Sequence, residues 1–513
     1  MIFFKKYISI LLLLLLMISF AQGKDIYVSK SGTNEYPYTN WAAAATNIEW
    51  AVNAGVNNDT VWISNGVYVL TNQITINSNI TICSTGGVVE VNGDGAVRCF
   101  YITNTSARPT IKNITIANGG GIYTIYGTIT NCIFTNNVCT NSGGGMYMGS
   151  GTGLVLGCSF MNNIAGSNGG GLYVGKIQKV DACIFHTNTA FNGGGLYYSD
   201  GAGTAGALTT NCTFRHNVAS NSYGGAYMYY GILTHCTAVS NVAIAGNGGG
   251  FGGGGNTAHT VGIFTNCTIT DNIAWEGGGI SAGSYSFIRN CLIASNTANY
   301  NLSSWSGGGG AVKMATGAWM YDCIIEFNYA TGANIVTDYS PVLRHCLIRN
   351  NRAGGGGGVV LKRSGTLDSC TIVSNYATGN GGGINERGSG SAGGTYRNCI
   401  IYLNQSAGAG NYSNYYFAVA DLPSSFSNCC FAPALSDARI NYSANNITNN
   451  PLFIAPDSGN FRLSSSSPCV NRGFNRDWMT NGVDMDGKKR IRYGTVDMGV
   501  YELIYNGTIY GFQ

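Results

Sequence analysis

Charged residues, proline and long apolar runs are all scarce in this chain of 513 residues. Asp, Glu, Lys and Arg make up 10% of it, where about 25% is usual, and only 8 residues are proline. A hydrophobic content of 44% can bury a core, and so little charge cannot keep a chain expanded, which excludes a disordered protein. The net charge of +4 excludes a strongly basic surface, so we expect no nucleic-acid partner.

The segment 1–23 has the pattern of a secretory signal peptide. Two lysines precede the apolar stretch 8–20, and Ala21 and Gly23 lie at the −3 and −1 positions of a cut after Gly23. The apolar stretch is shorter than the ~20 residues that span a bilayer, so a cleaved signal is favoured over an uncleaved anchor. No later segment is apolar for long enough to cross a membrane. We therefore expect a secreted or cell-surface protein that is not an integral membrane protein after cleavage.

A short sequence motif that contains a cysteine recurs eleven times, and an asparagine follows each of these cysteines five residues later. The copies are about 27 residues apart, and most carry a glycine cluster roughly ten residues after the cysteine, followed by a short apolar segment. The repeated cysteines are Cys132, Cys158, Cys183, Cys212, Cys236, Cys267, Cys291, Cys323, Cys346, Cys370 and Cys399.

This repeat predicts an all-β fold, a right-handed parallel β-helix in which each unit forms one coil. Helical repeats need long stretches with a 3.6-residue period, which are missing, and propeller blades need about 40 residues. Alternation along a strand places Cys132 and Phe134 on one face and Ile133 on the other. Because neighbouring coils lie about 4.8 Å apart, equivalent positions should form columns along the axis.

These columns predict what lies inside and what lies at the corners. Cys and the following Phe or Ile should fill the interior, with Ala238 the undersized member of the second column. The asparagines should lie at a turn and hydrogen-bond to one another, and the glycines should allow corners with positive φ. Cysteines one coil apart have Cβ atoms too far apart for a bridge, which favours a ladder of buried thiols over disulfides. His235 and His345 precede column cysteines, so we expect them on the surface.

The two ends differ from the repeats, and we divide the chain into 1–23, 24–75, 76–430 and 431–513. In the segment 24–75 a strand and an amphipathic helix around 41–54 should cap the open end of the β-helix. Its buried stripe is predicted to consist of Ile48, Ala51, Val52 and Val56. The segment 431–513 is predicted to be a small C-terminal β module.

The Phe-x-x-Asn and Gly-Gly-x-hydrophobic motifs resemble the repeats of chlamydial polymorphic outer-membrane proteins, and more broadly bacterial pectin-lyase-like β-helices, over about Ile80 to Cys430. The chlamydial relatives are surface adhesins, so the resemblance implies a role at a surface. "NNPLFIAPDSGNFRLSSSSPCVNRGF" and "DMDGKKRIRYGTVDMGVYE" are similar to the choice-of-anchor Q module, which follows surface β-helices. Both resemblances bear on fold and location more than on activity.

Five tyrosines occupy the same place in successive repeats, and alternation should turn them outward as an aromatic column. Their rings and hydroxyls are suited to binding sugars, and the alternative is that they only stabilise the sheet through neighbour contacts. These candidate ligand-binding residues are Tyr123, Tyr147, Tyr173, Tyr197 and Tyr227.

Charged residues gather later in the repeats and suggest an enzymatic alternative. A polysaccharide lyase needs a basic side chain, neutralisation of a uronate and a groove, and Lys313, Lys362, Arg363 and Glu386 are the candidates. Solvated charges on one face are the simpler interpretation. In the C-terminal module Asp484, Asp486 and Asp497 can be ligands of a structural calcium ion or parts of an ordinary turn.

The sequence therefore leaves three hypotheses, of which a non-enzymatic surface β-helix that binds glycans comes first. The second is a polysaccharide lyase or glycoside hydrolase acting on an acidic polysaccharide, and the third is a structural component of a cell envelope. Fold alone cannot separate them.

Overall fold

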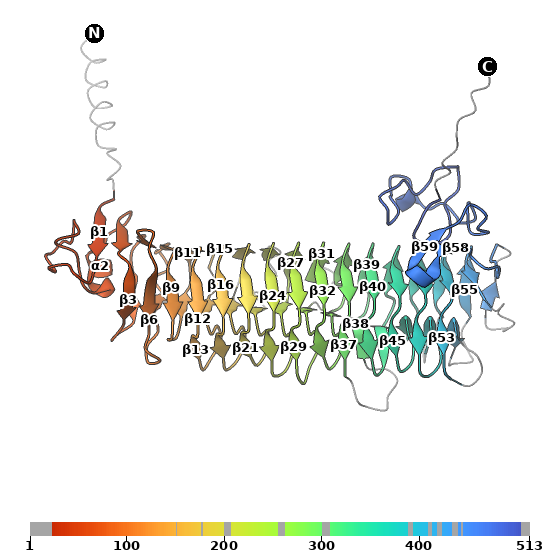
Figure 1. Cartoon of the computed structure of the whole chain (residues 1–513), viewed down its shortest axis with the longest axis horizontal. Helices are drawn as coiled ribbons and strands as arrows, with labels where there is room; N and C mark the ends of the chain where they lie inside the picture. Colours follow the sequence, from red (N-terminus) through yellow and green to blue (C-terminus); the bar gives the residue numbers. More distant parts are fainter. Residues whose placement is uncertain are drawn as a thin grey trace, which may run out of the picture.

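The computed structural model describes residues 23–503 apart from 150, 176–177, 200–206, 255–261, 300–307, 388–392, 409–412, 418–422, 433–439 and 443–444. All of the predicted signal peptide except Gly23 thus lies outside the described residues. The chain forms a long rod of stacked coils, with a helix at its N-terminal end and a smaller module on its side near the C-terminal end (Figure 1). No helix in the described part is long and apolar enough to cross a membrane.

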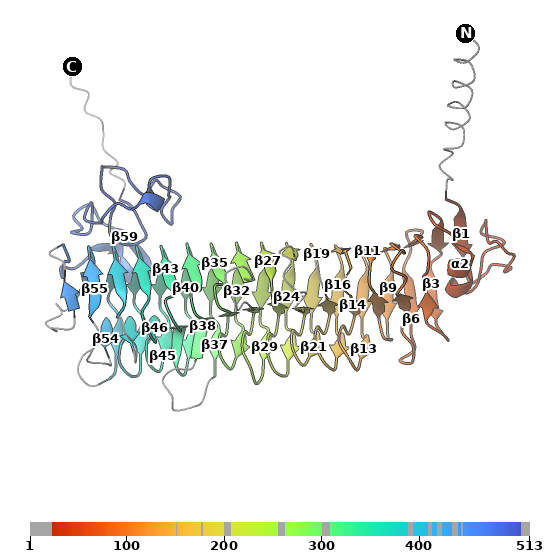
Figure 2. The same cartoon turned by 180° about the vertical axis from the view of Figure 1, so that it is seen from behind.

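Most coils contribute one short strand to each of four parallel sheets. A typical coil runs through β14 (Met146–Met148), β15 (Gly153–Leu156), β16 (Ser159–Met161) and β17 (Ile164–Ala165). We call the sheets that contain β15, β16, β14 and β17 sheets A, B, C and D, and they have 17, 15, 14 and 11 described strands. Each strand pairs in parallel with its equivalent in the next coil, as the view from behind also shows (Figure 2). The predicted parallel β-helix is confirmed.

The N-terminal end is closed by a shorter helix than the sequence predicts. Helix α2 spans Ile48–Ala54, and the side chain of its N-cap residue Asn47 accepts a hydrogen bond of 2.7 Å from the Glu49 amide. The expected start near Trp41 is wrong because residues 41–43 form a turn and Ala45 forms an isolated parallel bridge with Val28: the Ala45 amide donates to the Tyr27 carbonyl at 2.9 Å.

Most of the residues predicted to form the buried face of the helix are buried. The coils begin before the helix in the chain. Ile48, Ala51 and Val52 are buried, but Val56 is 60% exposed since it follows the end of the helix. The first coils begin at β1 (Asp25–Val28), which pairs with β2 (Thr60–Ile63) in sheet A.

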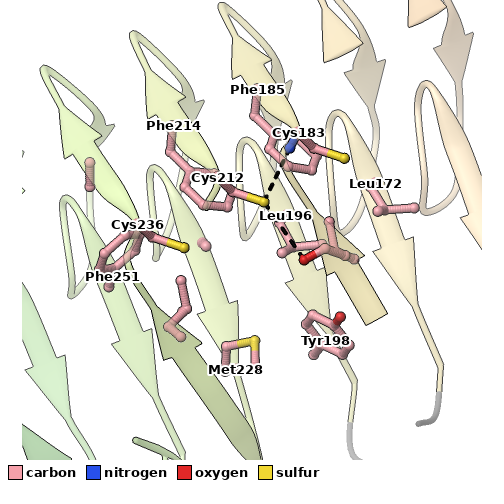
Figure 3. Close-up of a cluster of buried hydrophobic side chains, with 14 of the residues drawn as sticks. Leu172, Cys183, Phe185, Leu196, Tyr198, Cys212, Phe214, Met228, Cys236 and Phe251 are labelled. Atoms are coloured by element: carbon pink, nitrogen blue, oxygen red, sulfur yellow. Dashed lines mark hydrogen bonds between the residues drawn. The ribbon is translucent and has the colours of Figure 1, made fainter. Parts of the chain in front are cut away.

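The interior contains the predicted columns. All eleven repeat cysteines are buried free thiols, as is Cys429 beyond them. The residue two positions after each repeat cysteine, which is Phe or Ile except at Ala238, is buried as well. The phenylalanines are stacked, with ring centroids 4.6 Å apart for Phe134 and Phe160. Where Ala238 is too small, Phe251 of sheet C packs edge-on against Phe214 with centroids 5.6 Å apart, and both rings lie inside the coil (Figure 3).

The cysteines are more than apolar filler. The backbone amide of Cys183 donates to the sulfur of Cys212 in the next coil at 3.4 Å, a contact drawn in Figure 3. The Cys212 thiol in turn donates to the Thr210 carbonyl at 3.1 Å. Each of these thiols therefore provides a hydrogen-bond partner at a corner that is closed to water. Burial raises the pKa of the Cys132 thiol, which keeps it protonated.

The asparagines form the predicted ladder at the turn between sheets B and D. The side-chain amide of Asn188 donates to the Asn217 carbonyl oxygen at 2.9 Å, and that of Asn217 donates to Asn241 in the same way. Both also donate to a backbone carbonyl of the preceding coil. These asparagines are almost fully buried.

The glycine clusters meet two different requirements, of which the sequence predicts only one. The first glycine of a cluster has a positive φ, for example 61° at Gly193, as expected for a corner. The second is needed because neighbouring coils approach closely: a Cβ on Gly194 would lie 2.6 Å from the Gly224 carbonyl oxygen. Tyr223 takes the first position in one coil, with a φ of 67°.

The C-terminal module lies on the outer face of sheet B over the last coils (Figure 1). It includes the antiparallel hairpin β58 (Phe453–Ala455) and β59 (Asn460–Leu463). Its apolar side chains, including Phe461 and Val500, are buried against outward residues such as Leu347 of β44 (Leu347–Arg349) and Ile400 of β52 (Ile400–Tyr402). The module is thus joined to the rod by a second core.

Candidate functional site

The five predicted tyrosines do form a column on sheet C. Their strands are β10 (Ile122–Thr124), β14, β18 (Leu172–Val174), β22 (Leu196–Tyr198) and β26 (Ala226–Met228), and the tyrosines pair in register from Tyr123 to Tyr227. The residue before each tyrosine is buried, as predicted. Tyr101 extends the column by one coil at its N-terminal end.

The ring faces of this column cover one another. Tyr123 and Tyr147 are parallel within 1° with centroids 4.7 Å apart, and Tyr147 and Tyr173 are also 4.7 Å apart. Tyr227 is 7% exposed, with Tyr223 stacked on it at 4.2 Å. The column therefore offers ring edges to a ligand rather than open faces, and its role in glycan binding stays a prediction.

The four residues of the lyase hypothesis are not gathered into one group. Lys313 pairs with Glu276, Lys362 pairs with Asp338 at 3.2 Å, and the Arg363 guanidinium lies 3.8 Å from the Tyr339 ring centroid.

Glu386 points into the coil rather than toward solvent. It is 8% exposed and accepts hydrogen bonds of 2.9 Å from the hydroxyls of Tyr396 and Ser424. Its position in β50 (Ile384–Glu386) aligns with buried Leu361, which explains its inward direction.

The three aspartates proposed for calcium lie in the module with their oxygens bonded to the protein. Asp484 accepts from the amides of Asp486, Lys488 and Glu502, and Asp497 accepts from two further backbone amides. Asp486 forms a two-pronged pair with Arg462, which holds the pKa of this carboxyl below its usual value. Within the described ranges, no group of three or more His, Cys, Asp or Glu is arranged to hold a metal ion. Calcium stays a prediction.

A groove of about 870 Å³ lies where the C-terminal module meets the corner between sheets A and B. Its floor is a row of outward residues from β31 (Gly262–Thr265), β35 (Phe287–Arg289), β39 (Trp319–Tyr321) and β43 (Val342–Arg344). Thr265, Arg289, Tyr321 and Arg344 are in register in four successive coils. The segment 478–487 of the module forms the opposite wall.

The lining combines aromatic rings with amides and arginines. Phe287 meets Tyr321 edge-on with centroids 5.3 Å apart, and Trp478 faces them from the module. The Arg344 guanidinium carbon lies 4.6 Å from the Tyr321 ring centroid and 5.2 Å from that of Trp478. The indole NH of Trp478 donates to Asp368 at 3.3 Å, which holds this wall on the rod.

Asp322 and His345 sit at the corner beneath the groove. Asp322 accepts from Arg289 Nε at 3.0 Å and contacts His345 Nδ1 at 2.9 Å. Burial alone would raise the pKa of Asp322, but the hydrogen bond and charge of His345, together with Arg289, hold it below its usual value. His345 Nε2 lies 3.0 Å from the Val500 carbonyl oxygen. Both ring nitrogens of His345 are thus engaged by neighbouring oxygens.

The expectation of a surface His345 is wrong, whereas His235 is exposed as predicted. His345 does point out of its coil, but the module covers it and leaves it 2% exposed.

Sequence reasoning missed the groove, although the repeat contained a signal for it. The residue two positions before the repeat cysteine is Thr in several coils up to Thr265 and then becomes Arg289, Tyr321, Arg344 and Asp368. An alignment of the repeats on the cysteine would have placed these side chains in one row. It would not have placed Trp478, which comes from the module.

One comparison with known proteins, a match to a family model, supports the fold. A family model described as a right-handed β-helix region matches residues 232–406. Among solved structures, the pectate lyase Pel9A is 13% identical, with 94% of this chain and 97% of that chain covered and a TM-score of 0.27. A rhamnogalacturonan lyase is 13% identical, with coverages of 79% and 87% and a TM-score of 0.22. ORF18 of Geobacillus virus E2 is 12% identical, with coverages of 72% and 58% and a TM-score of 0.19.

No curated protein matches the chain. The TM-scores are too low for the solved structures to carry an argument about the site. Together with the parallel sheets, the family match makes the chain a right-handed parallel β-helix protein. The resemblances to the chlamydial repeats and to the anchor module stay predictions.

Proposed function

We propose that the chain is an exported, cell-surface β-helix that binds glycans without cleaving them, and that the groove beneath the C-terminal module is the binding site. The observation that carries the proposal is the lining of the groove, where Tyr321 and Trp478 stand beside polar Asn290 and Asn481. A sugar ring has apolar C–H faces and hydroxyl edges, and amphipathic aromatic rings beside amides match both. The four coils of the floor suit an extended chain of sugars.

The chemistry of the groove favours binding over cleavage. A general acid or base must reach a proton of its substrate. Asp322 is already bonded to Arg289 and His345, His345 is buried with both nitrogens occupied, and the Asp484 oxygens accept backbone amides. The lyase alternative has less support still, since Glu386 is buried inside the coil and the cations pair separately.

Export rests on the signal-peptide pattern of residues 1–23, and surface attachment rests on the resemblance of the segment 431–513 to an anchor module. The tyrosine column is a second surface for glycans, through its ring edges. A cell-fractionation experiment on the full chain tests the location, because a cytoplasmic protein would contradict export.

The binding experiment uses the protein lacking residues 1–23 on an array of neutral and acidic oligosaccharides, with affinities then measured by titration. Tyr321→Leu and Trp478→Ala should each weaken binding at least tenfold, because each removes an aromatic surface of the groove. Trp50→Ala is the matched control, since Trp50 is an exposed tryptophan on α2 at the other end of the rod. Melting curves establish that the variants remain folded.

Binding of no glycan, or equal binding by all variants, contradicts the proposal. Release of unsaturated products from an acidic polysaccharide, read by ultraviolet absorbance, would favour the lyase alternative.

A further inference from the structure

Arg344 differs from three other arginines on the same side of the rod. Arg289 pairs with Asp322 at 3.0 Å, Arg349 pairs with Glu326 at 2.6 Å, and Arg462 pairs with Asp486. Arg344 has no carboxylate within ion-pair distance among the described residues, and its Nε is buried without a hydrogen-bond partner. A guanidinium has five N–H donors, so this side chain has unused capacity for an acceptor.

The nearest carboxylate along the column forms no ion pair with Arg344. Asp368 follows Arg344 in register in the next coil. One Asp368 oxygen accepts from the Trp478 indole and the other from the Ser369 hydroxyl, at 3.3 and 3.0 Å. The rings of Tyr321 and Trp478 instead flank the guanidinium and fix its plane. Arginine stacks well on aromatic faces while its N–H edge stays available for a planar acceptor.

The ion pairs around the groove leave Arg344 without an acidic partner. Arg289 and His345 both contact the carboxylate of Asp322, and Arg344 does not. Asp484 lies at the rim, but its oxygens accept backbone amides and it is 3% exposed. A ligand that supplied one carboxylate would therefore provide the ionic partner that Arg344 lacks.

We propose that Arg344 is an anion subsite that binds the carboxylate of an acidic sugar residue, so that the groove selects uronate-containing glycans. This inference rests on the proposed function and adds the class of ligand. The carboxylate would accept two N–H donors of the guanidinium while the sugar ring lies against the neighbouring aromatic side chains. Charge-assisted bonds of this kind are the strong ones, and a factor of ten or more in affinity is the expected selectivity.

The test compares each of a set of hexuronate trisaccharides with its carboxyl-reduced, neutral counterpart. The wild-type protein should bind the acidic form at least tenfold more tightly, with an affinity that falls as salt is added. Arg344→Gln should remove this preference, because it should lower the affinity for the acidic form at least tenfold more than the affinity for the neutral form. Arg344→Lys should keep part of it, because the charge remains and the two-pronged geometry is lost.

Two controls separate a direct role of Arg344 from damage to the fold. Arg215→Gln makes the same change of charge at an exposed arginine on sheet B and should leave the preference intact. Limited proteolysis and Trp478 fluorescence should show that the module of Arg344→Gln remains docked.

Equal wild-type affinities for the acidic and neutral forms would overturn the anion subsite and leave the proposed function standing. An equal loss of affinity for the acidic and the neutral trisaccharides in Arg344→Gln would have the same two consequences. Sulfated trisaccharides are the third arm: Arg344-dependent binding of these, without binding of the uronates, would refute the carboxylate assignment. Binding of none of the three would refute the proposed function as well.

Discussion

Replacing Asn217 by alanine would remove one step of the buried asparagine ladder and measure what the ladder contributes. Its side chain takes part in four hydrogen bonds. It donates to the Phe185 carbonyl and to Asn241, each at 2.9 Å, and it accepts from the backbone and side-chain amides of Asn188 at 3.0 and 2.9 Å. Asn217 is 0% exposed, so water does not reach the groups left behind.

The magnitude follows from these four bonds. A typical hydrogen bond contributes about 1 kcal/mol net, and a buried donor left without a partner costs about 1–3 kcal/mol. We expect Asn217→Ala to lower the free energy of unfolding by about 4 kcal/mol. In a solenoid each coil contacts only its neighbours, so the loss should be concentrated in the coils that contain Asn188 and Asn241.

Urea unfolding followed by far-ultraviolet circular dichroism measures the change, and hydrogen exchange locates it. The control is Asn53→Ala, the same substitution at an exposed position of α2, which should change stability by less than about 0.5 kcal/mol. A loss below about 1 kcal/mol for Asn217→Ala, or exchange that rises evenly along the rod, would refute this account of the ladder.

Three further predictions concern the coils and the module. Gly194→Ala should destabilise the rod more than Gly95→Ala in urea unfolding, because a Cβ on Gly194 would lie 2.6 Å from a backbone oxygen. Nothing lies within 4 Å of a Cβ on Gly95, so only the positive φ of Gly95 opposes that substitution. Tyr173→Ala should cost about 1–3 kcal/mol, since it ends two ring stacks, and an unchanged melting temperature would show that the column contributes little stability. Burial raises the pKa of Glu502 to about 8 from 4.5, so the folded protein keeps a proton on this carboxyl that the unfolded chain releases. The module should therefore lose stability as the pH rises from 4.5 to 8. Glu502→Gln should flatten this pH dependence in melting curves.

Most of the rod could be predicted from the repeat, because each position of the repeat has the same role in every coil. Cys132 and Phe134 had to lie inside and Ile133 outside once the strand alternation was read, and the structure has them so, with Ile133 39% exposed. The hydrogen bonds from backbone amides to cysteine sulfur were not predictable, since they depend on which way the corner turns. The need for Gly194 likewise appears only when two coils are stacked.

The groove could be predicted in part. Its floor follows from the repeat register, but its other wall comes from the segment 478–487, and no periodicity relates this segment to Arg344. The burial of His345 has the same origin, because local alternation gives its direction and the distant Val500 covers it. The proposed binding site lies where a non-repeating segment packs against the repeats, and sequence periodicity cannot reveal that contact.

Because the coils stack in parallel, the number of repeats sets the distance along the rod between α2 and the groove. Each coil between α2 and the groove advances the axis by about 4.8 Å. Insertion or deletion of one complete repeat upstream of Thr265 would move the two ends apart or together by that increment while every wall of the groove kept its composition. Gain or loss of whole repeats would therefore change the length of the rod without changing the residues of the proposed binding groove.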